Sequence, residues 1–211
     1  MQMRVGIVGA GPAGLTLASV LSREAKKGSV VVEVFERGAE ERDQGSGWDL
    51  SKTAQDALTR AGVDVPSVQR HGSDTMRMYK LGQKHPQMCL RMPSMLKMLG
   101  LKKDHILEGL NPETERNEII NRLIAQLGSN VKVQHNCPIA GARRSKNEEE
   151  EGKIELLKRD GSSLGTFDVL VDASGVAAAL RHSRFSPKAD AFYTGTTFVQ
   201  GMVMSPEKSW A

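Results

Sequence analysis

The hydrophobic and polar positions of the N-terminal segment change from a strand period to a helix period and back. A β-branched run at 5–8 leads into a glycine-rich corner, and apolar residues then recur at helical spacing from Leu15 to Leu21. A second β-branched run, "SVVVEVFERG", follows at 29–38. A strand, a glycine turn, a helix and a strand in this order predict a βαβ unit of a parallel sheet.

Two later segments have the apolar spacing of helices. In 44–63 a glycine loop precedes Ala54, Leu58 and Ala61, which are spaced as on one helix face, and Gly62 is a natural C-cap. In 112–128 a stripe of isoleucine and leucine residues predicts a further helix over the whole range.

The remaining segments predict strands and connections. Residues 71–110 suggest irregular strands or a small excursion, and 130–175 suggest four strands separated by charged turns. The acidic run at 147–152 has the composition of a solvated loop between two of these strands. At 167–181 the strand, glycine and helix pattern recurs, which would return the chain to the first sheet. The predicted fold class is therefore α/β, with a strand meander inserted into a Rossmann-like domain.

The glycine-rich corner has the spacing of a dinucleotide-binding turn. Gly9, Gly11 and Gly14 form G-x-G-x-x-G between a predicted strand and a predicted helix. In such a corner the first glycine permits the turn, the second lets a pyrophosphate approach the backbone, and the third lets the helix pack closely on the strand. Pro12 suits a first helical turn, where its missing N–H has no intrahelical partner. Glycine turns also arise for packing alone, so a purely structural corner is the alternative.

An acidic residue completes the pattern. Glu36 ends the second strand-like run, 22 residues after Gly14, close to the roughly 20 at which a carboxylate accepts hydrogen bonds from the adenosine ribose. A carboxylate here suits a free ribose rather than a 2'-phosphate. We therefore expect the bound dinucleotide to be FAD or NAD rather than NADP.

Composition argues against several other classes of protein. The net charge is +4, from 29 Lys and Arg against 25 Asp and Glu, and the basic residues are scattered. We expect no nucleic-acid partner, because such a protein would carry clustered basic residues. We also expect no membrane partner, because no apolar run approaches the length of a span and the N-terminal stretch lacks a cleavage site.

The cysteines and histidines do not form a chemical cluster along the chain. Cys89 and Cys137 stand alone, which favours two reduced thiols in a cytoplasmic protein. The five histidines are dispersed. We therefore predict no metal ligand and no catalytic base.

Five segments in order resemble the FAD-dependent aromatic hydroxylases, and among them the tetracycline-modifying type of flavin monooxygenase. They are "GAGPAG" with Glu36 and Arg37, "ERDQGSGWDL", "PETERNEI", "DVLVDASGVAAALR" and "TGTTFVQGMVMSPE". The resemblance implies an FAD cofactor, NADPH or NADH as co-substrate, and hydroxylation of an aromatic or polycyclic small molecule. It spans nearly the whole chain.

The resemblance also implies roles for individual residues. The corner residues would hold the FAD pyrophosphate, and Glu36 would hold the adenosine ribose; the implied corner residues are Gly9, Gly11, Pro12, Ala13 and Gly14. Asp49 matches an aspartate near the flavin, and Arg116 matches an arginine that packs against the cofactor. Arg42 matches an arginine implicated in NADPH contact. Asp49 could instead cap the helix that starts near Ser51, and Arg116 could be a surface residue.

The chain departs from the family pattern in the "DASG" segment and at its end. Ser174 stands where the hydroxylases have an aspartate that helps to bind FAD and nicotinamide, and Ala178 replaces a serine. Family members continue into a substrate-covering sheet and a second flavin motif of Gly-Asp type. We therefore expect that a missing C-terminal half or a second subunit completes the site. A reductase without oxygenation and a non-catalytic dinucleotide-binding remnant are the alternatives.

The same resemblance gives the domain organisation. Residues 1–187 would form the FAD- and NAD(P)-binding domain, with 71–110 as its excursion. Residues 188–211 would begin the sheet of a substrate domain.

Overall fold

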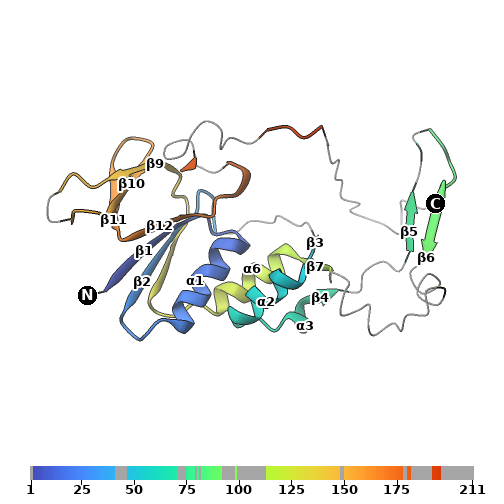
Figure 1. The fold of residues 1–211 in the computed structure, drawn as a ribbon, viewed down its shortest axis with the longest axis horizontal. Coiled ribbons are helices and arrows are strands. Elements are labelled where there is room, and N and C mark those ends of the chain that lie inside the picture. Colours follow the sequence, from blue (N-terminus) through green and yellow to red (C-terminus); the bar gives the residue numbers. More distant parts are fainter. Residues whose placement is uncertain are drawn as a thin grey trace.

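The computed structural model has an α/β fold built around a four-stranded parallel sheet (Figure 1). The residues that the structure describes are 2–40, 47–70, 75–78, 80, 82–91, 98, 113–147, 150–177, 180–181 and 192–195. The predicted fold class is confirmed. The predicted boundary at 187 and most of the predicted substrate-domain segment, 188–211, lie outside the described residues.

The parallel sheet has the strand order β12-β1-β2-β8. Its strands are β1 (Met3–Val8), β2 (Val30–Phe35), β8 (Val131–Gln134) and β12 (Val169–Asp172). The β-branched runs at the two N-terminal strands are largely buried because helices cover one face of the sheet and further strands cover the other. The predicted βαβ unit is therefore confirmed.

Helices α1 (Pro12–Glu24) and α6 (Arg116–Ala125) pack against each other beside the sheet, with α2 (Lys52–Arg60) and the short α3 (Val65–Val68) next to them. The prediction of a helix over the whole of 112–128 is wrong at its start. Residues Glu113–Glu115 form strand β7, and the helix begins only at Arg116, because these three residues pair with two other strands.

The ends of α2 follow its local sequence. The Oγ of Ser51 accepts a hydrogen bond from the backbone N–H of Ala54, at 3.3 Å, and so caps the N-terminus. Gly62 follows the C-terminal residues with φ +91°, which only glycine adopts readily. Ser51, and not Asp49, is the N-cap of this helix.

An antiparallel meander covers the other face of the parallel sheet. It consists of β9 (Ile139–Arg144), β10 (Ile154–Lys158) and β11 (Ser163–Phe167), in the order β11-β10-β9. The rings of Phe35 and Phe167 meet edge to face with centroids 5.7 Å apart and join the meander to the sheet.

The prediction of four strands in 130–175 is wrong, since the structure has five there. Strands β11 and β12 are separated in the sequence by Asp168 alone. The carboxylate of Asp168 accepts a hydrogen bond from the backbone N–H of Arg4, at 2.7 Å, where the chain passes from the meander to the parallel sheet. Asp168 therefore marks the end of β11, and β12 begins at the next residue.

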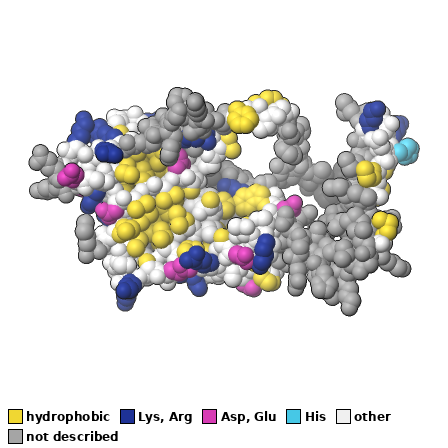
Figure 2. Space-filling model, in the orientation of Figure 1, with side chains coloured by type: hydrophobic (Ala, Val, Ile, Leu, Met, Phe, Trp, Pro, Cys, Tyr) yellow, Lys and Arg dark blue, Asp and Glu magenta, His cyan; other side chains and the backbone are white. Residues whose placement is uncertain are grey.

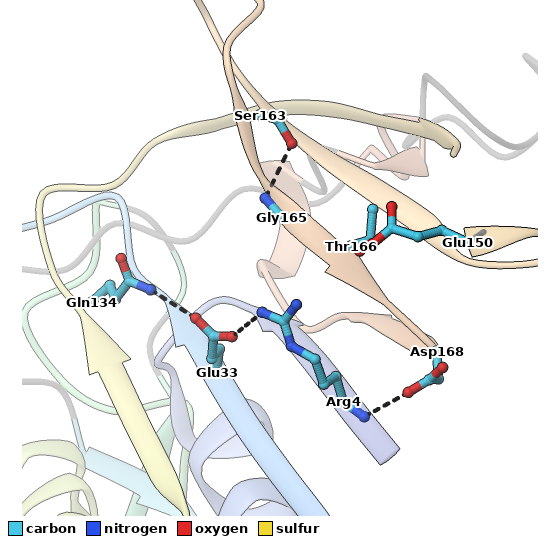
Figure 3. A network of polar contacts seen from close by, with 8 residues as sticks. All are labelled: Arg4, Glu33, Gln134, Glu150, Ser163, Gly165, Thr166 and Asp168. Atoms are coloured by element: carbon cyan, nitrogen blue, oxygen red, sulfur yellow. Dashed lines mark hydrogen bonds and ion pairs between the residues drawn. The ribbon is translucent and has the colours of Figure 1, made fainter. Parts of the chain in front are cut away.

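Polar side chains of neighbouring strands contact one another on the face of the parallel sheet that the meander covers (Figure 3). The guanidinium of Arg4 donates to Glu33 at 2.7 Å and lies 5.1 Å from the centroid of the Phe167 ring. The amide of Gln134 donates to the other carboxylate oxygen of Glu33, at 3.1 Å. Partly buried polar side chains of β1, β2 and β8 are therefore linked across the sheet.

One member of the acidic run at 147–152 is not simply solvated, contrary to the prediction. The carboxylate of Glu150 accepts hydrogen bonds from Thr166, at 2.6 Å, and from Ser145, at 3.1 Å (Figure 3 shows the side chains of Glu150 and Thr166). The hydrogen bond from Thr166 is the main cause of a lowered pKa for this carboxyl. The meander thus fixes Glu150 by contacts that the charge run alone does not reveal.

Two smaller sheets complete the described structure. Strands β3 (Gly47–Asp49), β7 and β4 (Gln69–Arg70) form an antiparallel sheet in the order β3-β7-β4. Strands β5 (Thr75–Met78) and β6 (Met88–Arg91) form a hairpin inside the predicted excursion, most of which lies outside the described residues. After β12 the chain continues into the short 3-10 helix η2 (Gly175–Ala177).

Candidate dinucleotide site

The three glycines of the corner have three different surroundings. Gly9 has φ +106°, and a Cβ there would lie 2.5 Å from the carbonyl oxygen of Ala173, at the end of β12. A Cβ on Gly14 would overlap the carbonyl oxygen of Gly9. A Cβ on Gly11, in contrast, would meet no atom within 4 Å. Two glycines are therefore required by the packing of the protein itself, and the third leaves an open position at the backbone.

That open position lies at the N-terminus of α1. Gly11 is the N-cap, Pro12 is the first helical residue, and no side chain caps this end. The backbone N–H of Leu15 bonds to the carbonyl of Gly11 at 2.9 Å. The N–H groups of Ala13 and Gly14 precede it and have no partner within an α-helix, and the first turn holds no acidic residue. Such a helix end attracts an anion through its N–H groups and its partial positive charge.

Glu36 lies against the same corner. It follows β2, and its two carboxylate oxygens accept hydrogen bonds from the backbone N–H groups of Ala10, at 3.0 Å, and Gly38, at 2.9 Å. These two donors hold the carboxylate beside the glycine corner. A carboxylate accepts hydrogen bonds, and the hydroxyl groups of an adenosine ribose are donors that suit it.

A groove of about 930 Å³ starts at this helix end. Pro12 and Ala13 line its beginning, and Trp48 and Asp49 of β3 also line it. Most of its wall is apolar and comes from α1 and α2, including Thr16, Leu17, Val20, Ala54 and Ala57. Figure 2 shows hydrophobic side chains gathered on the face of the molecule that carries α1. A mainly apolar hollow with a few polar groups is typical of a small-molecule site.

Asp49 and Arg116 approach this groove from neighbouring elements. Strands β3 and β7 pair with Gly47 opposite Glu115, which places Arg116, the first residue of α6, close to β3. The guanidinium carbon of Arg116 lies 5.9 Å from the centroid of the Trp48 ring. Asp49 is exposed and lines the groove directly. The structure thus brings both residues to the same region, and their contact with a cofactor stays a prediction.

Two other predicted residues are less informative. Arg37 follows Glu36 and is exposed, and Arg42 lies outside the described residues. Sequence reasoning did not single out Trp48, which lies between Gly47 and Asp49. The signal that was available is an aromatic residue directly beside a predicted cofactor aspartate.

A second, smaller hollow of about 460 Å³ lies over the meander. It is lined by polar and charged side chains, among them Arg4 near the start of β1, whereas the glycine corner follows the end of that strand. Its charges are largely paired, as between Arg143 and Glu155, whose atoms are 2.5 Å apart. This hollow is therefore separate from the dinucleotide site.

Within the ranges that the structure describes, the chain has neither a candidate membrane-spanning helix nor a candidate metal cluster. No helix there has both the length and the apolar character needed to cross a membrane. No group of three or more His, Cys, Asp or Glu side chains in those ranges could hold a metal ion.

Comparison with solved structures finds the same fold in one part of several longer proteins. A tetracycline destructase matches with a TM-score of 0.61 and 17% identity over 89% of this chain and 43% of its own. A variant of HpxO from Klebsiella pneumoniae, complexed with FAD, matches with a TM-score of 0.58 and 18% identity over 88% and 44%. The 2,6-dihydroxypyridine-3-hydroxylase from Arthrobacter nicotinovorans matches with a TM-score of 0.59 and 19% identity over 87% and 39%.

At the level of sequence, no protein-family model and no curated protein matches the chain. The chain spans less than half the length of the solved structures named above. Because these structures are less than 25% identical to the chain, they support a conclusion about its fold alone. The resemblance drawn from the five sequence segments is therefore confirmed for the fold: the chain has the α/β fold of one part of these solved structures.

Proposed function

We propose that this chain binds FAD at the glycine corner and acts as the cofactor-binding part of a monooxygenase. The observation that carries the proposal is the open position at Gly11, directly at the N-terminus of α1 and beside the fixed carboxylate of Glu36. A pyrophosphate requires such a close approach to the backbone, and an adenosine ribose requires an acceptor next to it.

Three parts of the site would hold FAD. The N–H groups at the start of α1 bind the pyrophosphate, and Glu36 accepts hydrogen bonds from the ribose. The mainly apolar groove beyond Pro12 and Ala13 offers a wall for the flat aromatic ring system of the flavin. Arg116 supplies a positive charge beside Trp48, which lines the groove.

When bound, FAD supplies the redox chemistry, taking electrons from a reduced nicotinamide and using them to activate oxygen. The role of the chain's own residues is then to bind, orient and desolvate. We propose NADPH or NADH as the co-substrate and an aromatic or polycyclic small molecule as the substrate. The rest of the substrate site would come from a C-terminal half or a second subunit. A cytoplasmic location suits the two unpaired thiols of Cys89 and Cys137.

A reductase without oxygenation is the second candidate, and Ser174 favours it. This serine donates to the carboxylate of Asp172 at the end of β12, at 2.5 Å, so it serves the turn itself. It stands where the resemblance would place an aspartate that helps to bind flavin and nicotinamide. A site with that aspartate missing is less suited to the full hydroxylase reaction.

The test is a turnover assay with the purified chain, FAD and either NADPH or NADH. Nicotinamide oxidation, peroxide and hydroxylated product are measured separately with an aromatic substrate. Hydroxylated product supports the monooxygenase, and oxidation coupled only to an artificial electron acceptor supports the reductase. Flavin binding without any nicotinamide oxidation would show that this chain alone holds the cofactor and that turnover requires the rest of the substrate site. Failure of the chain to bind FAD would contradict the proposal.

A further inference from the structure

Trp48 is the aromatic side chain that lines the groove next to the glycine corner. It is half-buried on β3, between Gly47 and Asp49. The guanidinium of Arg116 lies over its ring, with the guanidinium carbon 5.9 Å from the ring centroid. A cation at this distance from an indole ring is attracted to it. Arg116 therefore helps to keep the Trp48 ring in one orientation at the groove wall.

The strand order gives the direction in which a dinucleotide lies. The pyrophosphate position follows β1, and Glu36, which receives the ribose, follows the neighbouring strand β2. The groove starts at Pro12 and Ala13, and Glu36 does not line it. In the proposed function the adenosine half would lie on the β2 side of the pyrophosphate, which leaves the groove as the candidate space for the other half of the ligand.

We propose that Trp48 contacts the flavin ring of FAD and makes the groove selective for the flavin half of the ligand. This inference rests on the proposed function and goes beyond it, because the glycine corner alone recognises any adenine dinucleotide. An isoalloxazine ring is flat and aromatic, and the indole of Trp48 offers it an aromatic partner in an apolar wall. Arg116 is a positioning residue in this account, since it acts through the ring of Trp48.

The experiment compares two ligands that share the adenosine and pyrophosphate. ADP carries only the part that the glycine corner holds, and FAD adds the flavin half. Both are titrated calorimetrically into the wild-type chain, Trp48→Leu and Trp48→Phe. We expect Trp48→Leu to weaken FAD binding about 2- to 10-fold, the range for the loss of one aromatic pair, and to leave ADP binding unchanged. Trp48→Phe keeps an aromatic ring and should retain most of the FAD affinity.

Fluorescence gives a second readout that does not depend on turnover. The chain has two tryptophans, so Trp210→Phe leaves Trp48 as the only one. FAD should quench the Trp48 emission strongly in this variant, and ADP at saturation should change it little. Unquenched emission with FAD bound would place the flavin away from Trp48 and overturn the inference.

The possible outcomes separate this inference from the proposed function. An equal loss of ADP and FAD affinity in Trp48→Leu would show that Trp48 only supports the fold, and no loss of either would show that it contacts neither ligand. Both results overturn the inference while dinucleotide binding stands. Failure of the wild-type chain to bind either ligand would remove the proposed function, and the inference with it.

Discussion

The glycine corner and the groove are two ends of one candidate site, and they are built in different ways. At the corner, backbone atoms fix the geometry: Gly9 and Gly14 fit against neighbouring backbone, and two backbone N–H groups hold Glu36. The groove is formed mainly by side chains of α1, β3 and α2, with Arg116 of α6 against Trp48. The corner is therefore specified by a short local pattern, whereas the groove depends on how distant segments pack.

The largest expected effect concerns the stability of the corner. Gly14→Ala should lower the free energy of unfolding by about 3 kcal/mol, the upper part of the range for overpacking, because its Cβ would overlap a backbone carbonyl that cannot rotate away. Gly11→Ala is the matched control. Its φ of −76° suits any residue and its Cβ meets open space, so we expect a change of no more than about 0.5 kcal/mol. Equal losses in chemical denaturation would refute the distinction between the two glycines.

A smaller effect is expected at Glu36. Glu36→Ala should weaken ADP binding by roughly 1–3 kcal/mol, the range for hydrogen bonds to a charged acceptor. Glu36→Gln should reduce the preference of the chain for ADP over adenosine 2',5'-bisphosphate, because the repulsion between the carboxylate and a 2'-phosphate is removed. Calorimetric titration with both nucleotides measures the two effects. Unchanged ADP affinity in Glu36→Ala would mean that the carboxylate serves only the turn that contains Ala10 and Gly38.

The acidic connection of the meander should affect stability and neither end of the site. The pKa of Glu150 is lowered, mainly by the hydrogen bond from Thr166. Its ionised form therefore contributes stability above its unfolded pKa, and this contribution is lost as the pH falls through the lowered pKa of the folded state. Glu150→Gln should be less stable than wild type near neutral pH and nearly equal to it in strongly acidic buffer. Thermal melts at a series of pH values test this pH dependence. Glu151→Gln, a substitution of the exposed residue next to Glu150, is the control.

The smallest effect concerns the rates of thiol modification. Cys89 is exposed and should react rapidly with a thiol reagent, while Cys137 is buried. Burial raises the pKa of the Cys137 thiol, which lowers the thiolate fraction and slows the reaction. Because the backbone N–H of Cys137 donates to the carbonyl of Glu36, at 2.8 Å, bound ADP should slow Cys137 further and leave Cys89 unchanged. Equal slowing of both thiols by ADP, in a time course of modification, would contradict the expected connection between Glu36 and Cys137. The variant Cys89→Ser allows the modification of Cys137 to be measured alone.

Much of the corner could be predicted from the sequence, because its constraints are local. Glycine spacing, the β-branched runs and Glu36 all lie within one βαβ unit, and Gly62 ends α2 as its pattern predicts. The errors occur where distant pairing decides. Residues Glu113–Glu115 become a strand because β3 and β4 pair with them, and Glu150 is fixed by Thr166 from another strand.

The groove illustrates the same limit. Asp49 and Arg116 were predicted by resemblance to other proteins, and the contact between Arg116 and Trp48 requires the pairing of β3 with β7. No periodicity in the sequence brings these two segments together, since more than sixty residues separate them. Side-chain sites assembled across a fold are therefore less visible in a sequence than turns that a few glycines specify.

The most direct test of this account is a calorimetric titration of ADP into the wild-type chain and Gly11→Val. The branched side chain would fill the open position where the pyrophosphate would meet the backbone, and its Cβ would meet no atom of the protein within 4 Å. We predict saturable one-to-one binding to the wild-type chain and a loss of at least about tenfold in affinity in Gly11→Val, or about 1.4 kcal/mol. The two proteins should have similar melting temperatures. Equal ADP affinity in the two proteins would contradict the central claim that the glycine corner is a dinucleotide site.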